Sequence, residues 1–96
     1  MKIIFSEEAD LDLLHIHTYL AARNREAAIS LANAFAIKFE NLARFPFIVR
    51  NRSVFADRLR SVVVEKYVIF YQVERDRIFI VRVLDGRRDI DTEFQH

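Results

Sequence analysis

The stretch LRSVVVEKYVIFYQVERDRIFIVRVL, residues 59–84, contains three apolar runs separated by two short charged breaks. The runs at 59–64, 67–73 and 78–84 are rich in β-branched and aromatic residues, which favour strands. The breaks EK and ERDR are short enough to join neighbouring antiparallel strands, although neither has an Asn-Gly turn signal that would fix the hairpin geometry. The stretch therefore predicts a three-stranded antiparallel meander.

Two helices are predicted upstream of this meander. The first follows Ser6, a residue that can cap a helix, and covers about residues 7–22 with apolar residues at helical spacing. The second follows Asn24, covers residues 25–45 and must end before Pro46. Because the connection is so short, the two helices are expected to form an antiparallel hairpin.

The apolar run KIIF, residues 2–5, adds a short strand in front of the helices. The predicted order is β-α-α-β-β-β, and residues 46–58 form a connecting loop. A helical hairpin must bury its apolar stripe, and a meander offers an apolar face for it. The fold class is therefore α+β, with the helical hairpin packed on one face of a small antiparallel sheet and residues 1–96 forming a single domain.

Composition limits the classes of protein to which this chain can belong. It has 96 residues, of which 52% are hydrophobic, enough for one modest core. A net charge of +1 is too small for a dedicated duplex-DNA binder, and the absence of cysteine excludes disulfides and thiolate zinc sites. No apolar run approaches the roughly 20 residues of a membrane span, and the N-terminus turns acidic too early for a signal peptide. We therefore expect a cytoplasmic protein.

Few residues suggest metal or nucleophilic chemistry. His15 and His17 are two positions apart on a predicted helix, so they point about 200° apart and cannot share a metal. No serine is placed beside a histidine in a turn that would activate it as a nucleophile. The sequence predicts neither a metal site nor a cofactor.

The segment VLDGRRDIDTEF, residues 83–94, contains the only glycine, Gly86, followed by Arg87 and Arg88. We expect Gly86 to turn the chain sharply out of the last strand, in a backbone conformation that costs other residues about 1 kcal/mol, and to project both arginines. The alternative is a solvated segment in which Arg88 pairs with a neighbouring aspartate and contributes little.

Two further arginines are predicted to lie on the same meander. Arg82 is in the adjoining last strand and Arg60 is in the first strand of the meander. We expect several guanidinium groups to converge at one end of the sheet, where they could recognise a carboxylate or a phosphate.

Nearly the whole chain resembles one family, the ParE branch of the RelE/ParE toxins of bacterial toxin–antitoxin systems. FSEEADLDLLHIHTYLA is similar to its N-terminal strand and first helix, including the spacing of Ala9, Asp12 and Leu13. LARFP resembles the end of its second helix, and LRSVVVEKYVIFYQV its central strands. The most specific stretch is IFIVRVLDGRRDI, which resembles its last strand and arginine-containing tail.

The resemblance implies one of two activities. RelE-type members cleave messenger RNA in the ribosome, which requires groups that activate the 2′-hydroxyl, protonate the leaving oxygen and neutralise the phosphate. Arg88 matches their tail arginine. Other positions differ: the arginine after the strand tyrosine is Val68, the C-terminal tyrosine is Phe94, and the strand lysines fall near Leu59 and Ser61. Arg60 could replace a strand lysine only in part, and only in a different register.

ParE-type members inhibit DNA gyrase and are not enzymes. The resemblance therefore implies a gyrase inhibitor neutralised by a ParD-like antitoxin. The alternatives are a RelE-like ribosome-dependent, metal-independent mRNA endonuclease and a non-toxic orphan module that keeps antitoxin contacts. A neighbouring reading frame for an antitoxin with an acidic C-terminal half would favour the first two over the third.

These implications assign residues to two surfaces. The target-contact residues are expected to be Arg60, Arg82, Arg87, Arg88 and Phe94. An amphipathic antitoxin helix is expected to lie against the helical hairpin, with its acidic residues meeting Arg50, Arg52 or Arg58. The alternative for these three loop arginines is that they are merely solvated.

Overall fold

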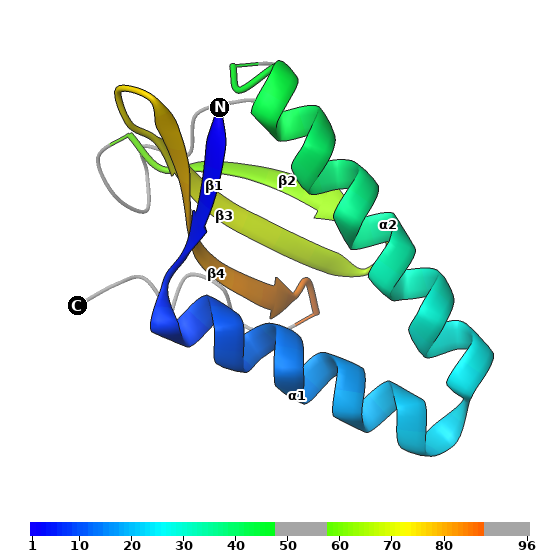
Figure 1. Ribbon diagram of the computed structural model, residues 1–96. Coiled ribbons are helices and arrows are strands. Elements are labelled where there is room, and N and C mark those ends of the chain that lie inside the picture. The colour runs from blue at the N-terminus through cyan, green and yellow to red at the C-terminus, as the bar shows by residue number, and fades with distance from the viewer. Residues whose placement is uncertain (48–57, 88–96) are drawn as a thin grey trace.

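The computed structural model describes residues 1–47 and 58–87, and its elements follow the predicted order. They are β1 (Lys2–Phe5), α1 (Glu7–Arg23), α2 (Arg25–Arg44), β2 (Arg60–Val64), β3 (Tyr67–Val73) and β4 (Arg77–Asp85). Figure 1 shows α1 and α2 diverging from a tight turn, with the strands drawn in the angle between them. The predicted α+β arrangement of a helical hairpin on one sheet face is confirmed.

Side-chain caps determine where both helices begin. The Ser6 hydroxyl accepts a hydrogen bond from the Ala9 N–H at 2.9 Å, and the Asn24 side chain accepts one from the Ala27 N–H at 3.0 Å. The Asn24 N–H also donates to the Leu20 carbonyl at 2.7 Å, which ends α1. One residue therefore ends the first helix and begins the second, as the predicted cap at Asn24 required.

The sheet is mixed, with strand order β1-β4-β3-β2. Strands β2, β3 and β4 form the predicted antiparallel meander. Strand β1 lies parallel to β4, with Lys2 opposite Arg77 and Phe5 opposite Ile80, so the sheet is not wholly antiparallel. The parallel pairing follows from the topology, because the long helical crossover lets β1 reach the outer edge of β4 instead of β2.

The main core lies between the helices and the sheet. Its fully buried members on the sheet are Ile69, Tyr71, Ile78 and Ile80, and Leu31, Phe35 and Leu42 cover them from α2. Phe39 makes an edge-to-face contact with Phe5, with ring centroids 5.1 Å apart, so β1 is part of the same packing.

The sheet also has a buried apolar cluster on its other face. Leu59, Val68, Phe70 and Leu84 form this cluster, and each is at most 8% exposed. Side chains alternate between the two faces of a strand, so the unbroken burial from Tyr67 to Tyr71 means that β3 is buried on both sides. The sequence analysis assigned an apolar role to one face of the meander only.

A β-bulge in β4 ties the start of α1 to the sheet. The register shifts so that Arg82 is opposite Phe70 while Ile80 is opposite Tyr71, which leaves Val81 as the extra residue. The Ser6 hydroxyl donates to the Val81 carbonyl at 2.7 Å, and the Ser6 N–H donates to the Ile80 carbonyl at 2.9 Å. The irregular part of β4 is therefore hydrogen-bonded by the residue that caps α1.

Asp12 completes this connection from the second turn of α1. Its carboxylate accepts two bonds from the Arg82 guanidinium, at 2.8 and 3.0 Å, and one from the Val83 N–H at 2.9 Å. The Asp12 and Arg82 side chains are only 13% and 26% exposed, so water weakens this pair less than it weakens a surface pair.

In the described ranges 1–47 and 58–87, no helix has the length and apolar character needed to cross a membrane.

We predict that Asp12→Ala destabilises the fold by about 2–3 kcal/mol, because it removes the acceptor of a charge-assisted two-point bond and of a backbone N–H. Urea unfolding followed by circular dichroism measures the change. Glu40→Ala is the matched control, since its bond to Arg44 is exposed and should contribute about 0.5 kcal/mol or less. A loss for Asp12→Ala no larger than for Glu40→Ala would contradict the anchoring role.

Candidate functional site

A polar groove of about 380 Å³ lies between α1, the start of β3 and the end of β4. The turn between β2 and β3 and the turn after β4 meet there, and α1 forms the opposite wall. The charged and aromatic lining consists of Asp12, His15, Tyr19, Lys66, Tyr67, Asp85 and Arg87. This groove contains the Gly86–Arg87 turn that the sequence analysis selected.

Gly86 is required for a different reason from the one expected. Its φ angle is not positive, so the predicted special backbone conformation is wrong. Instead, the Gly86 N–H donates to the Lys66 carbonyl at 2.7 Å, and an added Cβ would lie only 3.0 Å from that carbonyl oxygen. Glycine therefore allows the two turns to approach each other closely.

Asp85 holds the Arg87 side chain in place. Its carboxylate accepts the Arg87 N–H at 2.9 Å, and it accepts guanidinium bonds at 3.4 and 3.3 Å. The Lys66 ammonium lies 3.8 Å from the same carboxylate. Because the Arg87 side chain remains 74% exposed, it can exchange this weak pair for an anion on a partner.

The pKa values of Asp85, Arg87 and Tyr67 are shifted in this groove: hydrogen bonding to Asp85 raises that of Arg87. The hydrogen bonds from Arg87 hold the pKa of Asp85 below its ordinary value of 3.8. Burial raises the pKa of Tyr67, and the Asp85 carboxylate raises it further. Tyr67 therefore keeps its proton at neutral pH and offers a hydrogen-bond donor, beside a lysine whose ammonium is 5.5 Å from its ring centroid.

The predicted convergence of the arginines is not found for those that the structure describes. Arg60 is opposite Tyr71, whereas Arg87 follows Asp85, which is opposite Tyr67 at the other end of β3. Arg60 lies over the Phe47 ring, with its guanidinium carbon 4.8 Å from the centroid. Four residues of strand separate the two positions, which is about 13 Å.

The other predicted site residues fall into two groups. Arg82 lies at the bulge and binds Asp12, so its guanidinium is engaged within the fold. Arg58 lies just before β2 and lines a separate hollow. Arg88, Phe94, Arg50 and Arg52 lie outside the described residues, as do the aspartates considered as partners of Arg88. His15 and His17 do not form part of a metal-binding group among the described residues.

Sequence reasoning missed Lys66 and Asp85 as members of this site. Lys66 belongs to a charged break that was interpreted only as a turn. Its proximity to Arg87 could have been found from the register of the hairpin, because β2 ends opposite the start of β3, beside the end of β4. Glu65 has a φ of 54°, a left-handed backbone conformation that glycine usually adopts. Because a glutamate holds this position, the sequence does not mark the tight turn with a glycine.

An apolar groove of about 270 Å³ lies between α1 and α2. Its apolar lining includes Leu13, Ile16, Leu20, Leu31, Phe35 and Phe39. Ala32 and Ala36, which are exposed, line it from α2 and would allow a partner backbone to approach closely. The groove coincides with the place where sequence analysis expected an antitoxin helix.

The chain was compared with known protein families and with solved structures. The family described as "ParE toxin of type II toxin-antitoxin system, parDE" matches residues 3–90. The chain belongs to this ParE toxin family. Among solved structures, it is similar to a chain of "Chromosomal ParDE TA system from P. aeruginosa", with a TM-score of 0.74 and 17% identity over 88% of this chain and 95% of that one. No curated protein matches the chain.

Family membership confirms the resemblance derived from the strand, helix and tail motifs. At 17% identity the similarity to the solved ParDE chain shows the ParE-like fold alone. The Gly86–Arg87 turn and the groove beside it fall within the matched region. What this ParE family member contacts through that groove is a separate question of chemistry.

We predict that Arg87→Ala raises the pKa of Asp85 toward 3.8, because it removes the side-chain hydrogen bonds that stabilise the carboxylate. Carboxyl ¹³C NMR titration measures this pKa. The Asp85 pKa is lowered in the folded state, so its contribution to stability is present above the unfolded pKa and is lost as pH falls through the folded one. The stability difference between wild type and Arg87→Ala should therefore disappear at low pH.

Lys66→Ala is the matched comparison, since Lys66 is farther from the carboxylate and lowers its pKa less. It should produce the smaller rise in the Asp85 pKa. A larger rise in Lys66→Ala than in Arg87→Ala would show that the ammonium, rather than the guanidinium, controls Asp85.

Proposed function

We propose that this ParE family member is a toxin that inhibits DNA gyrase and is neutralised by a ParD-like antitoxin. The observation that carries the choice of target is the buried apolar cluster on the helix-free sheet face. Leu59 and Val68 belong to this cluster and correspond to positions where nuclease-type relatives are expected to have cations. A buried leucine and valine can neither neutralise a phosphate nor transfer a proton.

RNA cleavage without a metal requires several polar groups around one phosphate. At the two positions compared, Leu59 and Val68 are apolar and buried. Arg60, the substitute considered, is opposite the helix-facing Tyr71 and lies over the Phe47 ring. The C-terminal position of the nuclease tyrosine is Phe94, which has no proton to give. These features support a binding mechanism over a catalytic one.

Arg87 is the described residue best suited to contact the target. It is exposed, oriented by Asp85 and positioned beside Lys66 and the protonated Tyr67, so three donors lie around one groove. Arg88 is the next residue in the sequence, and Phe94 follows later in the same segment. Arg60 and Arg82 lie apart from Arg87 in their contacts, since Arg60 lies over the Phe47 ring and Arg82 binds Asp12. They would contact the target through a separate surface, or after giving up these contacts.

The antitoxin is proposed to bind the apolar groove between α1 and α2. An amphipathic helix can place its apolar face in such a groove and its acidic face toward basic residues at the rim. Arg50 and Arg52 are proposed to meet that acidic face. Arg58, the described member of the same basic set, lines a separate hollow and would have to meet acidic residues from another part of the antitoxin. The "ParDE" description of the family and of the solved relative supports a partner of this kind.

We expect the double variant Arg87→Ala, Arg88→Ala to lose most of its growth inhibition, with its thermal stability and its antitoxin affinity nearly unchanged. The reason is that an exposed recognition arginine contributes to a partner interface and little to the fold. Induced expression without antitoxin measures growth, and scanning calorimetry measures stability. Lys38→Ala, Arg44→Ala removes the same charge from α2 and should remain toxic.

Full toxicity in the folded double variant would remove the tail arginines from the mechanism, and lost antitoxin binding would move them to the partner interface.

Wild-type expression should produce filamentous cells with DNA damage, because a poisoned gyrase leaves strand breaks. Pulse labelling tests the alternative: loss of protein synthesis with cut messages before any effect on DNA would favour the mRNA endonuclease.

We predict that Ala32→Glu weakens antitoxin binding at least tenfold, about 1.4 kcal/mol, because it places a charge in the apolar groove. Isothermal titration calorimetry with the antitoxin from the neighbouring reading frame measures the affinity. Asn33→Glu is the control, since Asn33 is also exposed on α2 but does not line the groove. Equal effects of the two changes would exclude the groove as the docking site, and no binding by wild type would refute the toxin–antitoxin pairing.

A further inference from the structure

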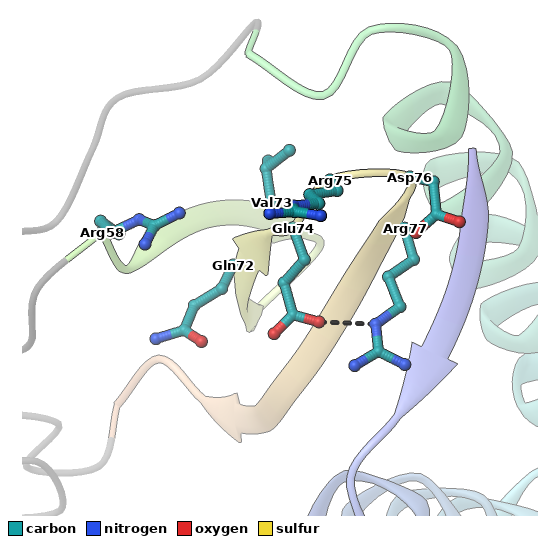
Figure 2. A pocket seen from close by; sticks show the side chains of 7 residues that line it. All are labelled: Arg58, Gln72, Val73, Glu74, Arg75, Asp76 and Arg77. Atoms are coloured by element: carbon teal, nitrogen blue, oxygen red, sulfur yellow. Dashed lines mark hydrogen bonds and ion pairs between the residues drawn. The ribbon is translucent and has the colours of Figure 1, made fainter.

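A second polar hollow, of about 590 Å³, lies at the β3–β4 turn, away from the two grooves described above. Arg58 extends into it from the segment before β2, and Glu74 and Arg77 lie side by side on the hairpin (Figure 2). Gln72 and Glu74 alternate with the helix-facing Tyr71 and Val73, so their side chains are on the helix-free face. The hollow is therefore on the opposite side of the sheet from the helical hairpin.

Two of the three arginines in this hollow are available to a partner. Arg77 bonds Glu74 at 2.6 Å, and the two charges offset each other. Arg58 and Arg75 have neither a hydrogen bond nor an ion pair in the described residues. Two guanidinium groups, each able to bind a carboxylate through two parallel bonds, therefore line one concave surface.

Arg58 has an unusual backbone conformation. Its φ is 63°, in the left-handed region that is strained for a residue with a Cβ and that glycine or asparagine would occupy more easily. The turn itself is explained by Leu59, which is 1% exposed and must point into the apolar cluster. The burial of Leu59 does not explain why the strained position holds an arginine, whose side chain extends into the hollow.

The charge pattern favours an acidic peptide over nucleic acid. Glu74 and Asp76 line the hollow beside the arginines, and they would repel the closely spaced phosphates of a nucleic acid backbone. A peptide avoids this repulsion, because it can place one or two carboxylates on Arg58 and Arg75 and direct neutral or donor groups toward Glu74 and Asp76. The Gln72 amide supplies both a donor and an acceptor for a peptide backbone.

We infer that this hollow binds a short acidic segment of the antitoxin through Arg58 and Arg75, an inference that rests on the partner proposed above. The segment contacts the sheet face opposite the helical hairpin. One antitoxin chain would therefore hold the toxin on two sides, with an apolar contact in the groove between the helices and a charged contact in the hollow. Arg75 and Gln72 are the residues that this site adds to Arg58.

The first experiment uses a hexaglutamate peptide as the probe. Arginine Nε resonances of the ¹⁵N-labelled chain are followed by NMR at low salt, and those of Arg58 and Arg75 should shift and saturate. Arg58→Asn suits the left-handed backbone and removes the guanidinium, so it should fold at least as stably as wild type and bind the peptide at least tenfold more weakly. Arg75→Ala should behave likewise, and Arg23→Ala, at the far end of α1, should bind as wild type does.

The second experiment measures antitoxin affinity for the same variants. A tenfold loss in Arg58→Asn and Arg75→Ala, with none in Arg23→Ala, supports the inference. Normal affinity in both variants overturns it and leaves the proposed function intact, whereas no binding by wild type refutes the proposed function itself. The inference is also overturned if hexaglutamate does not shift the Arg58 and Arg75 resonances. It is overturned as well if titration of these resonances shows that a 12-base-pair DNA duplex binds more tightly than the peptide.

Discussion

The connection between Asp12 and the β4 bulge determines how the helices lie on the sheet. The Asp12 carboxylate accepts hydrogen bonds from the Arg82 guanidinium and from the Val83 N–H. Ser6 donates to the carbonyls of Ile80 and Val81, just before them in β4. A bulge frees backbone groups from the regular ladder, and buried backbone groups need partners. The first turns of α1 supply those partners, so the irregularity in the strand and the position of the helix depend on each other.

This connection also sets the position of the Arg87 groove. From Asp12, α1 continues along the sheet end, and His15 and Tyr19 follow at helical spacing to form the wall opposite Lys66 and Arg87. A rotation or shift of α1 would widen the groove without any change at the Gly86–Arg87 turn. The geometry of the groove therefore depends on the contact that Asp12 makes with Arg82 and Val83 at one end of it.

The features that sequence predicted are those encoded by local chemistry. Ser6 and Asn24 identify the helix starts because each offers an oxygen to backbone N–H groups, and the apolar periods of 59–84 identify the strands. The parallel pairing of β1 could not be predicted, because a strand of four residues carries no information about its direction relative to its neighbour. The roles of Arg82 and Gly86 could not be predicted from the sequence either. The role of Arg82 depends on a bulge in β4, and that of Gly86 on the close approach of the Lys66 turn.

The same limit applies to the arginines as a group. The sequence does not show how the environments of these arginines differ: Arg82 is bound to Asp12, Arg87 is held by Asp85, and Arg58 extends into a separate hollow. Arg82 and Arg87 each donate two guanidinium bonds, but those of Arg82 are 2.8 and 3.0 Å long and its side chain is 26% exposed, whereas those of Arg87 are 3.4 and 3.3 Å long and its side chain is 74% exposed. Bond length and burial therefore separate a guanidinium that contributes to the fold from one that can bind another molecule.

The arrangement of the surfaces suggests how a partner in the interhelical groove could affect the Arg87 groove. Ile16 lines both, since it lies on α1 between the apolar and the polar surface. A helix packed against Leu13, Ile16 and Leu20 would therefore lie within one side chain of the wall that faces Arg87. Neutralisation would then require no large rearrangement of the toxin, because an occupied apolar groove restricts access to the polar groove directly beside it.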